Sequence, residues 1–540
     1  MAEKMNFKNV CWLLFYLAAF FFILYTSCER LDPDLGWHLQ VGREIMATRS
    51  VPAIEHFDYV LAGKSWVDHE WFSNALLYWL YNHLGYIFLS CFFAFLIVLI
   101  LWLANQYLKD YFIEKRHYEN LPFILLPLET LGLLAISPHI GVRIQEIGLL
   151  FLLLLLISLE KYERRGKIWQ LLVIIPLLYS WSCLHGSFLI GIFILFCWPA
   201  VKIIEKFISR WQIFSFLDFT SLASWKKIQI FTTLAIASCA ITLFTPYGTK
   251  LYTFLFNFRD NFYATHISEW LPAWYFPFQY NQLFYLALTT TVMLFPLLQS
   301  ITAKKPITPA AKSTLWQWGI FLLFLLLAFK SRRHFPLFFI ASLPLVVKNI
   351  ANGLAGIELK FFINDFLVKF YVIVTFTLVI TALILKTNFT NEPFTYKKFC
   401  QTYPCTAINF LKNCPDKDQK IFNNYNWGGF LIWVWPGKEL FIDGRLPQYP
   451  YKNQTFLQEY YEFFDEKKVA RKLEEYQIGA VLLKINTPIK IKLWEKILFG
   501  VDEKKINGYP NYLDVYLSSS PHWQLIYHDD ISRIYKNNEK

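Results

Sequence analysis

Long apolar runs separated by polar loops dominate the first two thirds of the chain. The first run, residues 10–28, reads VCWLLFYLAAFFFILYTSC and is about long enough to cross a bilayer. Further runs begin near residues 76, 121, 144, 168, 187, 229, 282, 314, 335 and 369. The pattern predicts a polytopic helical membrane protein with about eleven transmembrane helices. A signal peptide is the alternative for the first run, but no small-residue cleavage site follows it, so we predict an uncleaved anchor.

Charges in the loops predict the orientation of the chain. With the N terminus inside the cell, every second loop is basic, as the positive-inside rule requires. The inside loops carry Lys109, Lys115, Arg116, Lys161, Arg164, Arg165, Lys167, Lys202, Lys206, Arg210, Lys226, Lys227, Lys304, Lys305, Lys312, Lys348, Lys360 and Lys369. These loops account for much of the formal net charge of +12. No basic stripe interleaved with stacking aromatic residues lies outside the membrane, so we expect the lipid bilayer and no nucleic acid as a partner.

The C-terminal part of the chain has shorter apolar runs and more charge. KIFNNY, ELFIDGR and GAVLLKI are typical of strands, WGGFLIWVW and EKKVARKLEEYQ of helices, and WQLIYHDDISRIYK of a closing hairpin. Strands that alternate with helices predict a small parallel or mixed α/β domain. We therefore predict a transmembrane domain over residues 1–386 and an extracytoplasmic α/β domain over residues 387–540, in a multi-pass protein of the cell (inner or plasma) membrane.

Two local features of this C-terminal part carry structural expectations. Cys400, Cys405 and Cys414 can form one disulfide, which would leave one thiol over. The glycines of WGG are better explained by close packing than by phosphate binding, because no P-loop or GxGxxG pattern is present.

The first outer loop, residues 29–75, is crowded with acidic and histidine side chains. Capping is one explanation: Asp32 is a good N-cap before Pro33, and SWVD resembles a capping box before a second helix along the membrane. Capping explains one carboxylate at each helix start. It does not explain the remaining set, which is Asp34, His38, Glu55, His56, Asp58, Asp68, His69 and Glu70.

The aspartates of DPD suggest acid–base or metal chemistry. Two carboxylates two residues apart can hold a divalent cation such as Mg²⁺ or Mn²⁺, or one can act as a base that the other tunes. Pro33 disfavours helical backbone at Asp32, whereas Asp34 lies in the first turn, where the positive helix end favours its ionised form. We assign Asp34 as the general base and Asp32 as its supporting carboxylate or metal ligand.

Arg143, Arg332 and Arg333 fall at outer helix ends, where the positive-inside rule disfavours them. Single arginines can snorkel at an interface, but three on the face that carries the aspartates favour a bound anion such as a lipid phosphate. His334 and His185 could help to bind the phosphate or relay protons; the alternative is that the backbone satisfies these interior histidines.

The motifs resemble those of a bacterial group of polytopic proteins placed with the GT-C glycosyltransferases, alongside protein O-mannosyltransferases and aminoarabinose transferases. The first loop of that group runs roughly D-P-D-x-W-W-H-L, then P-x-x-D-x-F-S-Y, then G-x-x-W-x-x-x-E-W-L. The resemblance continues through WSCLHG, TPYG, ISEW, RRHFP, NNYNWGGFLIW and FIDGR. Departures are Gly36 in place of the first tryptophan, Cys183 and Thr245 where asparagine is common, and EHFDY in place of D-x-F-S-Y.

The resemblance implies a sugar donor on a polyprenyl phosphate and an envelope glycan, lipid or protein as acceptor. A first-loop aspartate would deprotonate the acceptor, and attack would invert the anomeric carbon. The substrate-binding candidates are His38, Asp68, His69, Glu70, Glu269, Asp443 and Arg445. For Asp443 and Arg445, the alternative is a structural ion pair around a glycine turn.

Two other functions stay open at this point. A transporter or flippase of lipid-linked glycans would commonly show internal repeats, and none is apparent. A non-catalytic envelope assembly protein could use its C-terminal part as a binding module.

Overall fold

The computed structural model describes residues 7–112, 121–211, 217–220, 222–257, 261–275, 279–302, 312–353, 366–485, 488, 490–499 and 511–539. The chain forms two compact units. Unit 1 comprises Met1–Ser27, Ser90–Thr245 and Phe278–Asn388, and unit 2 comprises Cys28–Leu89, Pro246–Pro277 and Phe389–Lys540. The basic loop residues Lys115, Arg116, Lys304, Lys305 and Lys360 lie outside the described residues.

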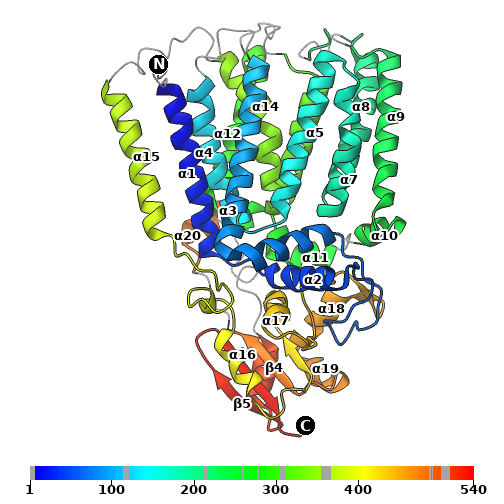
Figure 1. The fold of residues 1–540 in the computed structure, drawn as a ribbon, viewed down its shortest axis with the longest axis vertical. Helices are drawn as coiled ribbons and strands as arrows, with labels where there is room; N and C mark the ends of the chain where they lie inside the picture. Colours follow the sequence, from blue (N-terminus) through cyan, green and yellow to red (C-terminus); the bar gives the residue numbers. More distant parts are fainter. Residues whose placement is uncertain are drawn as a thin grey trace. The chain divides into compact units, whose positions relative to one another are not determined.

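Unit 1 is built from apolar helices that lie side by side (Figure 1). The helices that form it, or that continue from it into unit 2, are α1 (Phe7–Glu29), α3 (Trp71–Phe112), α4 (Leu121–Ile136), α5 (Gln145–Arg165), α6 (Trp169–Leu172), α7 (Ile174–Leu184), α8 (Phe188–Ile208), α9 (Trp225–Ile241), α12 (Tyr280–Thr302), α13 (Leu315–Lys330), α14 (Phe335–Gly353) and α15 (Phe366–Lys386). Each predicted apolar run coincides with a helix. Among the described residues, seven helices are long and apolar enough to cross a membrane, which indicates an integral membrane protein.

Small residues and buried ion pairs hold the unit 1 helices together. Gly132 on α4 faces the ring of Phe339 on α14, where a Cβ would come within 2.0 Å of the ring. Lys202 on α8 is buried and forms ion pairs with Glu163 on α5 at 2.5 Å and with Glu205 at 3.1 Å. Buried charges need such partners, so this network fixes α8 against α5.

The helix α3 is interrupted at Gly85, whose backbone is left-handed (φ 76°). The break removes the intrahelical partner of a following amide, and the side chain of Asn391 replaces it. The Ile87 N–H donates to Asn391 Oδ1 at 3.1 Å, and a Cβ on Gly85 would lie 2.7 Å from the same oxygen. Glycine is needed here both for the positive φ and for the close approach.

Unit 2 joins three separate parts of the sequence. Its remaining helices are α2 (Leu35–Thr48), α10 (Thr249–Asn257), α11 (Asn261–His266), α16 (Cys405–Lys412), α17 (Gly428–Val434), α18 (Phe456–Tyr461), α19 (Val469–Glu475), α20 (Leu493–Phe499) and α22 (Tyr512–Ser519). Its strands are β1 (Ile421–Asn423), β2 (Pro450–Tyr451), β3 (Gln454–Thr455), β4 (Ala480–Lys484), β5 (Trp523–His528) and β6 (Ser532–Asn537). The predicted boundary at residue 387 stays a prediction, and these compact units group the first outer loop with the tail.

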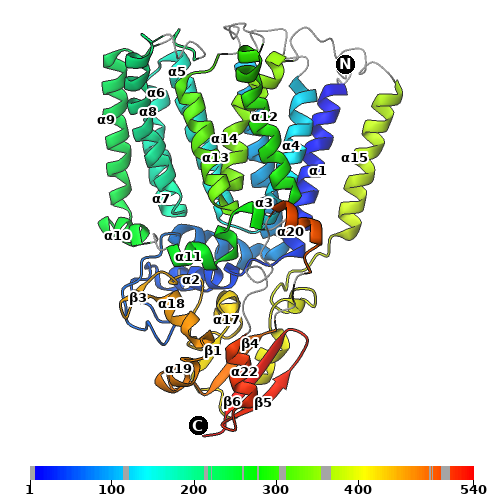
Figure 2. The ribbon, with the colours of Figure 1, turned by 180° about the vertical axis from the view of Figure 1, so that it is seen from behind.

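A four-stranded mixed sheet has the order β1-β4-β6-β5. β1 and β4 are parallel, whereas β4–β6 and β5–β6 are antiparallel, as Figure 2 shows from behind. The predicted strands KIFNNY and GAVLLKI and the closing hairpin are therefore confirmed. Cys400 and Cys405 form the expected disulfide, and Cys414 is the thiol left over.

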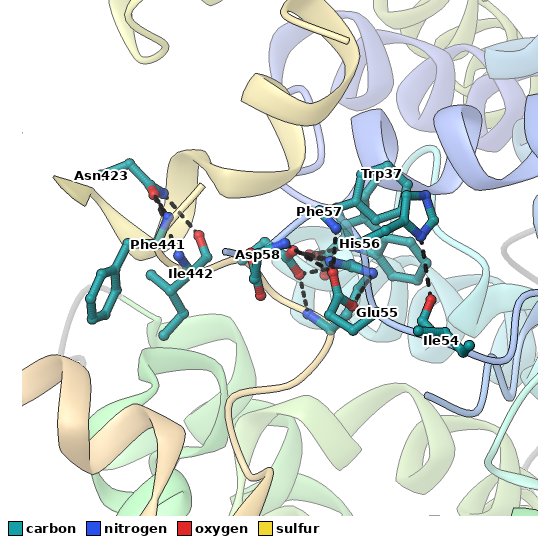
Figure 3. A network of polar contacts seen from close by, with 12 residues as sticks. Trp37, Ile54, Glu55, His56, Phe57, Asp58, Asn423, Phe441 and Ile442 are labelled. Carbon is teal, nitrogen blue, oxygen red and sulfur yellow. Dashed lines mark hydrogen bonds and ion pairs between the residues drawn. The ribbon is translucent and has the colours of Figure 1, made fainter. Parts of the chain in front are cut away.

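Two local predictions are wrong. ELFIDGR is not a strand: Leu440 makes only an isolated bridge with Asp58, and the side chain of Asn423 takes the place of a neighbouring strand. Asn423 Oδ1 accepts from the Phe441 N–H at 2.9 Å, while its Nδ2 donates to the Ile442 carbonyl at 2.8 Å (Figure 3).

SWVD is also not a capping box. Ser65 pairs with Ile54 in a bridge, and α3 begins only at Trp71. Asp68 Oδ1 accepts from the Glu70 N–H at 3.1 Å, in the turn just before the helix.

Candidate functional site

The two aspartates of DPD have different roles at the start of α2. α2 begins at Leu35 with Asp34 as its N-cap, so the predicted N-cap at Asp32 is wrong; Asp32 Oδ1 accepts from the Asp34 N–H at 2.9 Å in the turn before the helix. Asp34 makes no side-chain cap hydrogen bond. Its Oδ1 instead accepts from Trp37 Nε1 at 3.0 Å, one turn along the helix. Both aspartates are half-buried. The indole of Trp37 therefore orients Asp34 while the carboxylate stays reachable.

The tail of the chain reaches the same carboxylate. A Cβ on Gly444, in FIDGR, would lie 2.3 Å from Asp34 Oδ1. Gly429, in WGG, is equally close to α2, because a Cβ there would lie 2.3 Å from the Pro33 carbonyl oxygen. The close-packing explanation of WGG is thus confirmed. The DPD motif and the tail motifs WGG and FIDGR, which lie far apart in sequence, therefore meet at the start of α2.

Behind Asp34, a buried chain of hydrogen bonds starts at His38. The His38 Nδ1 lies 2.6 Å from Asn74 Oδ1, and Asn74 Nδ2 donates to Asp68 Oδ2 at 2.8 Å. Because the amide nitrogen of Asn74 faces Asp68, its oxygen is the acceptor and His38 carries a proton on Nδ1. Neutral His38 therefore keeps the lone pair of Nε2.

Burial shifts the pKa values of His38 and Asp68, the two ends of this hydrogen-bonded series. Burial lowers the pKa of His38, although the carboxylate of Glu70, the hydrogen bond to Asn74 and the charge of Asp32 oppose the shift. Burial also raises the pKa of Asp68 to about 6, against the effects of His69 and Asn74. Both directions favour the neutral forms, as expected for groups removed from water. The predicted residues Asp32, His38, Asp68 and Glu70 thus share one electrostatic environment.

His69 and Glu269 are placed differently from the buried chain. His69 is half-buried, its ring centre lies 5.6 Å from that of Phe254 of α10 with the two rings tilted, and its Nε2 lies 3.5 Å from Glu70 Oε1. Glu269 lies in a short 3₁₀ turn, Ser268–Trp270, and is half-buried within unit 2.

The FIDGR motif forms a buried acid–arginine cluster with EHFDY, made of Glu55, Asp58, Asp443 and Arg445. Arg445 Nη1 and Nη2 donate to the two oxygens of Glu55 at 2.7 and 3.0 Å. Arg445 Nε donates to Asp443 Oδ1 at 2.9 Å. Asp443 and Arg445 are thus in the structural ion pair that the sequence left as the alternative, and substrate binding by them stays a prediction.

Aromatic rings complete the surroundings of Arg445. Its guanidinium lies 4.5 Å from the ring centre of Phe57 and 4.6 Å from that of Trp66. Burial, the largest single effect, raises the pKa of Glu55, but the charge and hydrogen bonds of Arg445, together with the N–H groups of Phe57 and Asp58, lower it overall. Figure 3 shows Glu55 also accepting from the backbone of Phe57 and Asp58. Charge-assisted, bidentate pairing of this kind fixes the loop to the tail.

Asp58 is the unusual member of the cluster. It is 1% exposed, and neither of its oxygens accepts a hydrogen bond. Burial, together with the carboxylates of Asp443 and Glu55, raises the pKa of Asp58 well above its ordinary value. The protonated acid relieves the repulsion and has a proton to donate to Asp443.

In unit 1, predicted anion-binding residues gather at the start of α5. Arg143 lies two residues before the first residue of α5. His185 Nδ1 accepts from the Ser187 N–H at 3.1 Å and lies 2.7 Å from its Oγ. Gly148, in the first turn of α5, leaves room for this pair, since a Cβ there would lie 2.5 Å from Ser187 Oγ. Helix N-termini present free N–H groups and positive potential, which suits a phosphate.

Arg332, Arg333 and His334 form a 3₁₀ turn directly before α14. The Arg333 N–H donates to Ser331 Oγ at 3.3 Å, and His334 Nδ1 lies 3.3 Å from the Leu327 carbonyl oxygen. A backbone carbonyl therefore partners His334, which is the alternative that the sequence left open for the interior histidines. Arg332 and Arg333 lie just before a second helix N-terminus, that of α14.

Sequence reasoning missed Asn74, Gly444 and Tyr247. Asn74 lies one turn after Glu70, so its helical spacing from that carboxylate was an available signal. The close approach of Gly444 to Asp34 has no sequence signal. Tyr247, in TPYG, donates its hydroxyl to the Pro52 carbonyl at 2.6 Å, which fastens residues 246–277 to the first loop.

A metal fits these positions poorly. One oxygen of each DPD aspartate already accepts a hydrogen bond. Within the described part of the chain, no group of three or more His, Cys, Asp or Glu side chains could hold a metal ion. The divalent cation therefore stays a prediction.

Comparison with known proteins supports the fold. No protein-family model matches the chain, and no curated protein matches it. Among solved structures, the chain is similar to the oligosaccharyltransferase of Archaeoglobus fulgidus in its apo form, with 9% identity and a TM-score of 0.51. The alignment covers 89% of this chain and 70% of that chain. The predicted fold class, a polytopic helical membrane protein of GT-C type with a C-terminal α/β part, is confirmed.

Proposed function

We propose that the protein is an integral-membrane glycosyltransferase that moves a sugar from a polyprenyl-phosphate carrier to an envelope acceptor. The acceptor hydroxyl attacks the anomeric carbon as the bond from that carbon to the phosphate oxygen breaks. The configuration inverts, the polyprenyl phosphate leaves, and the hydroxyl proton goes to Asp34. The site faces the outside of the cell membrane, where the tail also lies.

The observation that carries the proposal is the setting of Asp34. The carboxylate is half-buried at a helix start, is oriented by Trp37 Nε1 at 3.0 Å, and lies beside a glycine that leaves it space. A general base needs a fixed orientation and access to the acceptor, and this carboxylate has both. The similarity of fold to an oligosaccharyltransferase is consistent with sugar transfer.

We also propose that Arg143, Arg332, Arg333, His185 and His334 bind the phosphate of the donor. Arginine forks fit phosphate oxygens, and the arginines precede the N-termini of α5 and α14. Of the substrate-binding candidates, His69 and Glu269 are half-buried, whereas His38, Asp68 and Glu70 are buried. We propose that His69 and Glu269 contact the acceptor and that His38, Asp68 and Glu70 position it.

The test is transfer by Asp34→Asn in membranes that receive radiolabelled polyprenyl-phosphate sugars and envelope acceptors. The amide keeps the shape of the side chain but cannot take the proton. Loss of a general base costs about 10²–10⁴ in rate. Asp530→Asn, at an exposed aspartate of the tail, is the matched control and should transfer at the wild-type rate.

Further arms separate the roles. Asp32→Asn should cost less than Asp34→Asn if Asp32 only holds the turn before α2, and comparably if it holds a metal, which added Mn²⁺ or EDTA would reveal. Arg143→Gln, Arg332→Gln and Arg333→Gln should each weaken donor binding roughly ten- to a hundredfold. A folded Asp34→Asn that transfers normally removes Asp34 as the base. Translocation of the lipid-linked sugar without transfer would favour the flippase alternative.

A further inference from the structure

α20 presents large apolar side chains to its surroundings. Leu493 is 73% exposed, Ile497 is 75% exposed and Trp494 is 46% exposed. Leu493 and Ile497 are four residues apart and therefore lie on the same face of the helix. Exposed apolar groups gathered on one face mark a surface that meets a partner or a membrane.

The opposite face of α20 carries a buried acidic side chain. Glu495 is only 7% exposed, and its Oε2 accepts from the Lys492 N–H at 2.7 Å at the helix start. The acidic side chain on the face away from Leu493 and Ile497 is therefore buried, whereas the apolar face is exposed. Lys490 and Lys492 are exposed beside the apolar face, and Lys496 is half-buried. Apolar residues with tryptophan and flanking lysines are typical of helices that lie in a membrane interface.

The position of α20 within unit 2 favours a lipid surface as the partner. Unit 2 contains the end of α1 and the first part of α3, which belong to candidate membrane spans. Figures 1 and 2 both draw α20 at the end of unit 2 that α1 enters, and β5 and β6 at the opposite end. α20 therefore lies at the end of unit 2 that holds the last residues of the α1 span, and its lysines would complement anionic headgroups.

We infer that α20 is an interfacial anchor of unit 2. It lays Leu493, Trp494 and Ile497 into the boundary between headgroups and acyl chains, with Lys490 and Lys492 beside lipid phosphates. This role goes beyond sugar transfer and does not depend on it. The anchor would hold the sheet of unit 2 at a fixed height above a bilayer that contains anionic lipid.

The test places a fluorophore on Leu493→Cys or Ile497→Cys of the full chain in nanodiscs. Cys414→Ser removes the half-buried tail thiol from the background. Lipids with a nitroxide near the headgroup should quench the fluorophore strongly, and aqueous iodide should quench it weakly. Val515→Cys, at an apolar residue of α22 that is 57% exposed, is the matched control and should respond in the opposite way.

Charge is tested in the same variants. In low salt and anionic lipid, Lys490→Gln or Lys492→Gln should shift the equilibrium of α20 away from the membrane-bound form. The equilibrium constant for membrane binding of α20 should fall by up to about fivefold for each lysine removed. Strong iodide quenching at both positions overturns the proposal. Protection from both quenchers also overturns it, because a protein partner and not lipid would then cover the face.

Discussion

Asp58 illustrates how burial and neighbouring charges set the protonation of a single residue. Three carboxyl groups surround one arginine in the buried acid–arginine cluster. If all were ionised, the two charges of Glu55 and Asp443 would already exceed the single charge of Arg445, and Asp58 would add further uncompensated negative charge. Burial of an unpaired charge is costly, so the raised pKa of Asp58 is the expected response.

The prediction at this scale concerns pH. A carboxyl group with a raised native pKa contributes stability that is present below its ordinary pKa and is lost as pH rises through the native value. Asp58→Asn removes this titration while keeping a neutral side chain. Between about pH 4 and the native pKa, the variant should gain stability over wild type by at most about 1.4 kcal/mol per pH unit.

Thermal unfolding of the full chain at several pH values measures this difference. Asp68, whose pKa is raised to about 6 by burial, titrates in both proteins and cancels in the comparison. Asp530→Asn controls for the loss of one carboxyl group at an exposed position. A difference between Asp58→Asn and wild type that stays constant with pH would show that Asp58 is ionised in the folded protein.

At the scale of elements, α2 and α17 touch through glycine. A Cβ on Gly36 would lie 2.2 Å from the Gly429 carbonyl oxygen, and one on Gly429 would lie 2.3 Å from that of Pro33. Backbone atoms cannot give way as flexible side chains do, so any side chain here would push the helices apart. Gly36 stands where the resembled group has the first tryptophan of its pair, and it lies at this contact between α2 and α17.

Gly429→Ala should destabilise the protein by about 1–3 kcal/mol, because it overpacks this contact. Gly319→Ala is the matched control: a Cβ on Gly319, inside α13, meets nothing within 4 Å, so it should be neutral or slightly stabilising. Thermal unfolding compares the two. Equal melting temperatures would contradict the close contact.

Gly444→Ala separates packing from chemistry. The three atoms nearest to its new Cβ all belong to the Asp34 carboxylate, which is the end of a side chain and can move. We expect near wild-type stability and reduced transfer, because the proposed base is displaced. Loss of stability with unchanged transfer would argue that Gly444 matters only for folding.

For the whole molecule, the decisive property is which segments of the chain make up unit 2. The first loop and the tail belong to one compact unit, although more than three hundred residues separate them in sequence. Two segments of one compact unit cannot lie on opposite sides of a membrane. Their sidedness must therefore be the same, whichever side it is.

Cysteine labelling in intact cells tests sidedness. Lys64→Cys, in the first loop, and Lys468→Cys, in the tail, should both react with a membrane-impermeant reagent from outside. Arg164→Cys, near the end of α5, is the matched control and should react only after permeabilisation. Reaction of the two unit 2 positions from opposite sides would contradict the unit itself. Reaction of both only after permeabilisation would reverse the predicted orientation.

The sequence by itself determined the features that depend on local pattern. Apolar runs specify membrane helices because an unpaired backbone cannot cross lipid. Alternation and turn residues predicted β1, β4 and the closing hairpin. Local composition also indicated that WGG serves close packing.

Only the tertiary structure decided which distant residues meet. ELFIDGR has the pattern of a strand, but the side chain of Asn423 satisfies its backbone and prevents a ladder. Arg445 pairs with Asp443 of its own motif and also with Glu55 of the first loop, a partner that its motif does not indicate. The contact between Gly444 and Asp34 depends on glycine having no side chain, and an absent atom leaves no periodic signal in a sequence. Such contacts arise from the geometry of packing across the chain, which local pattern does not encode.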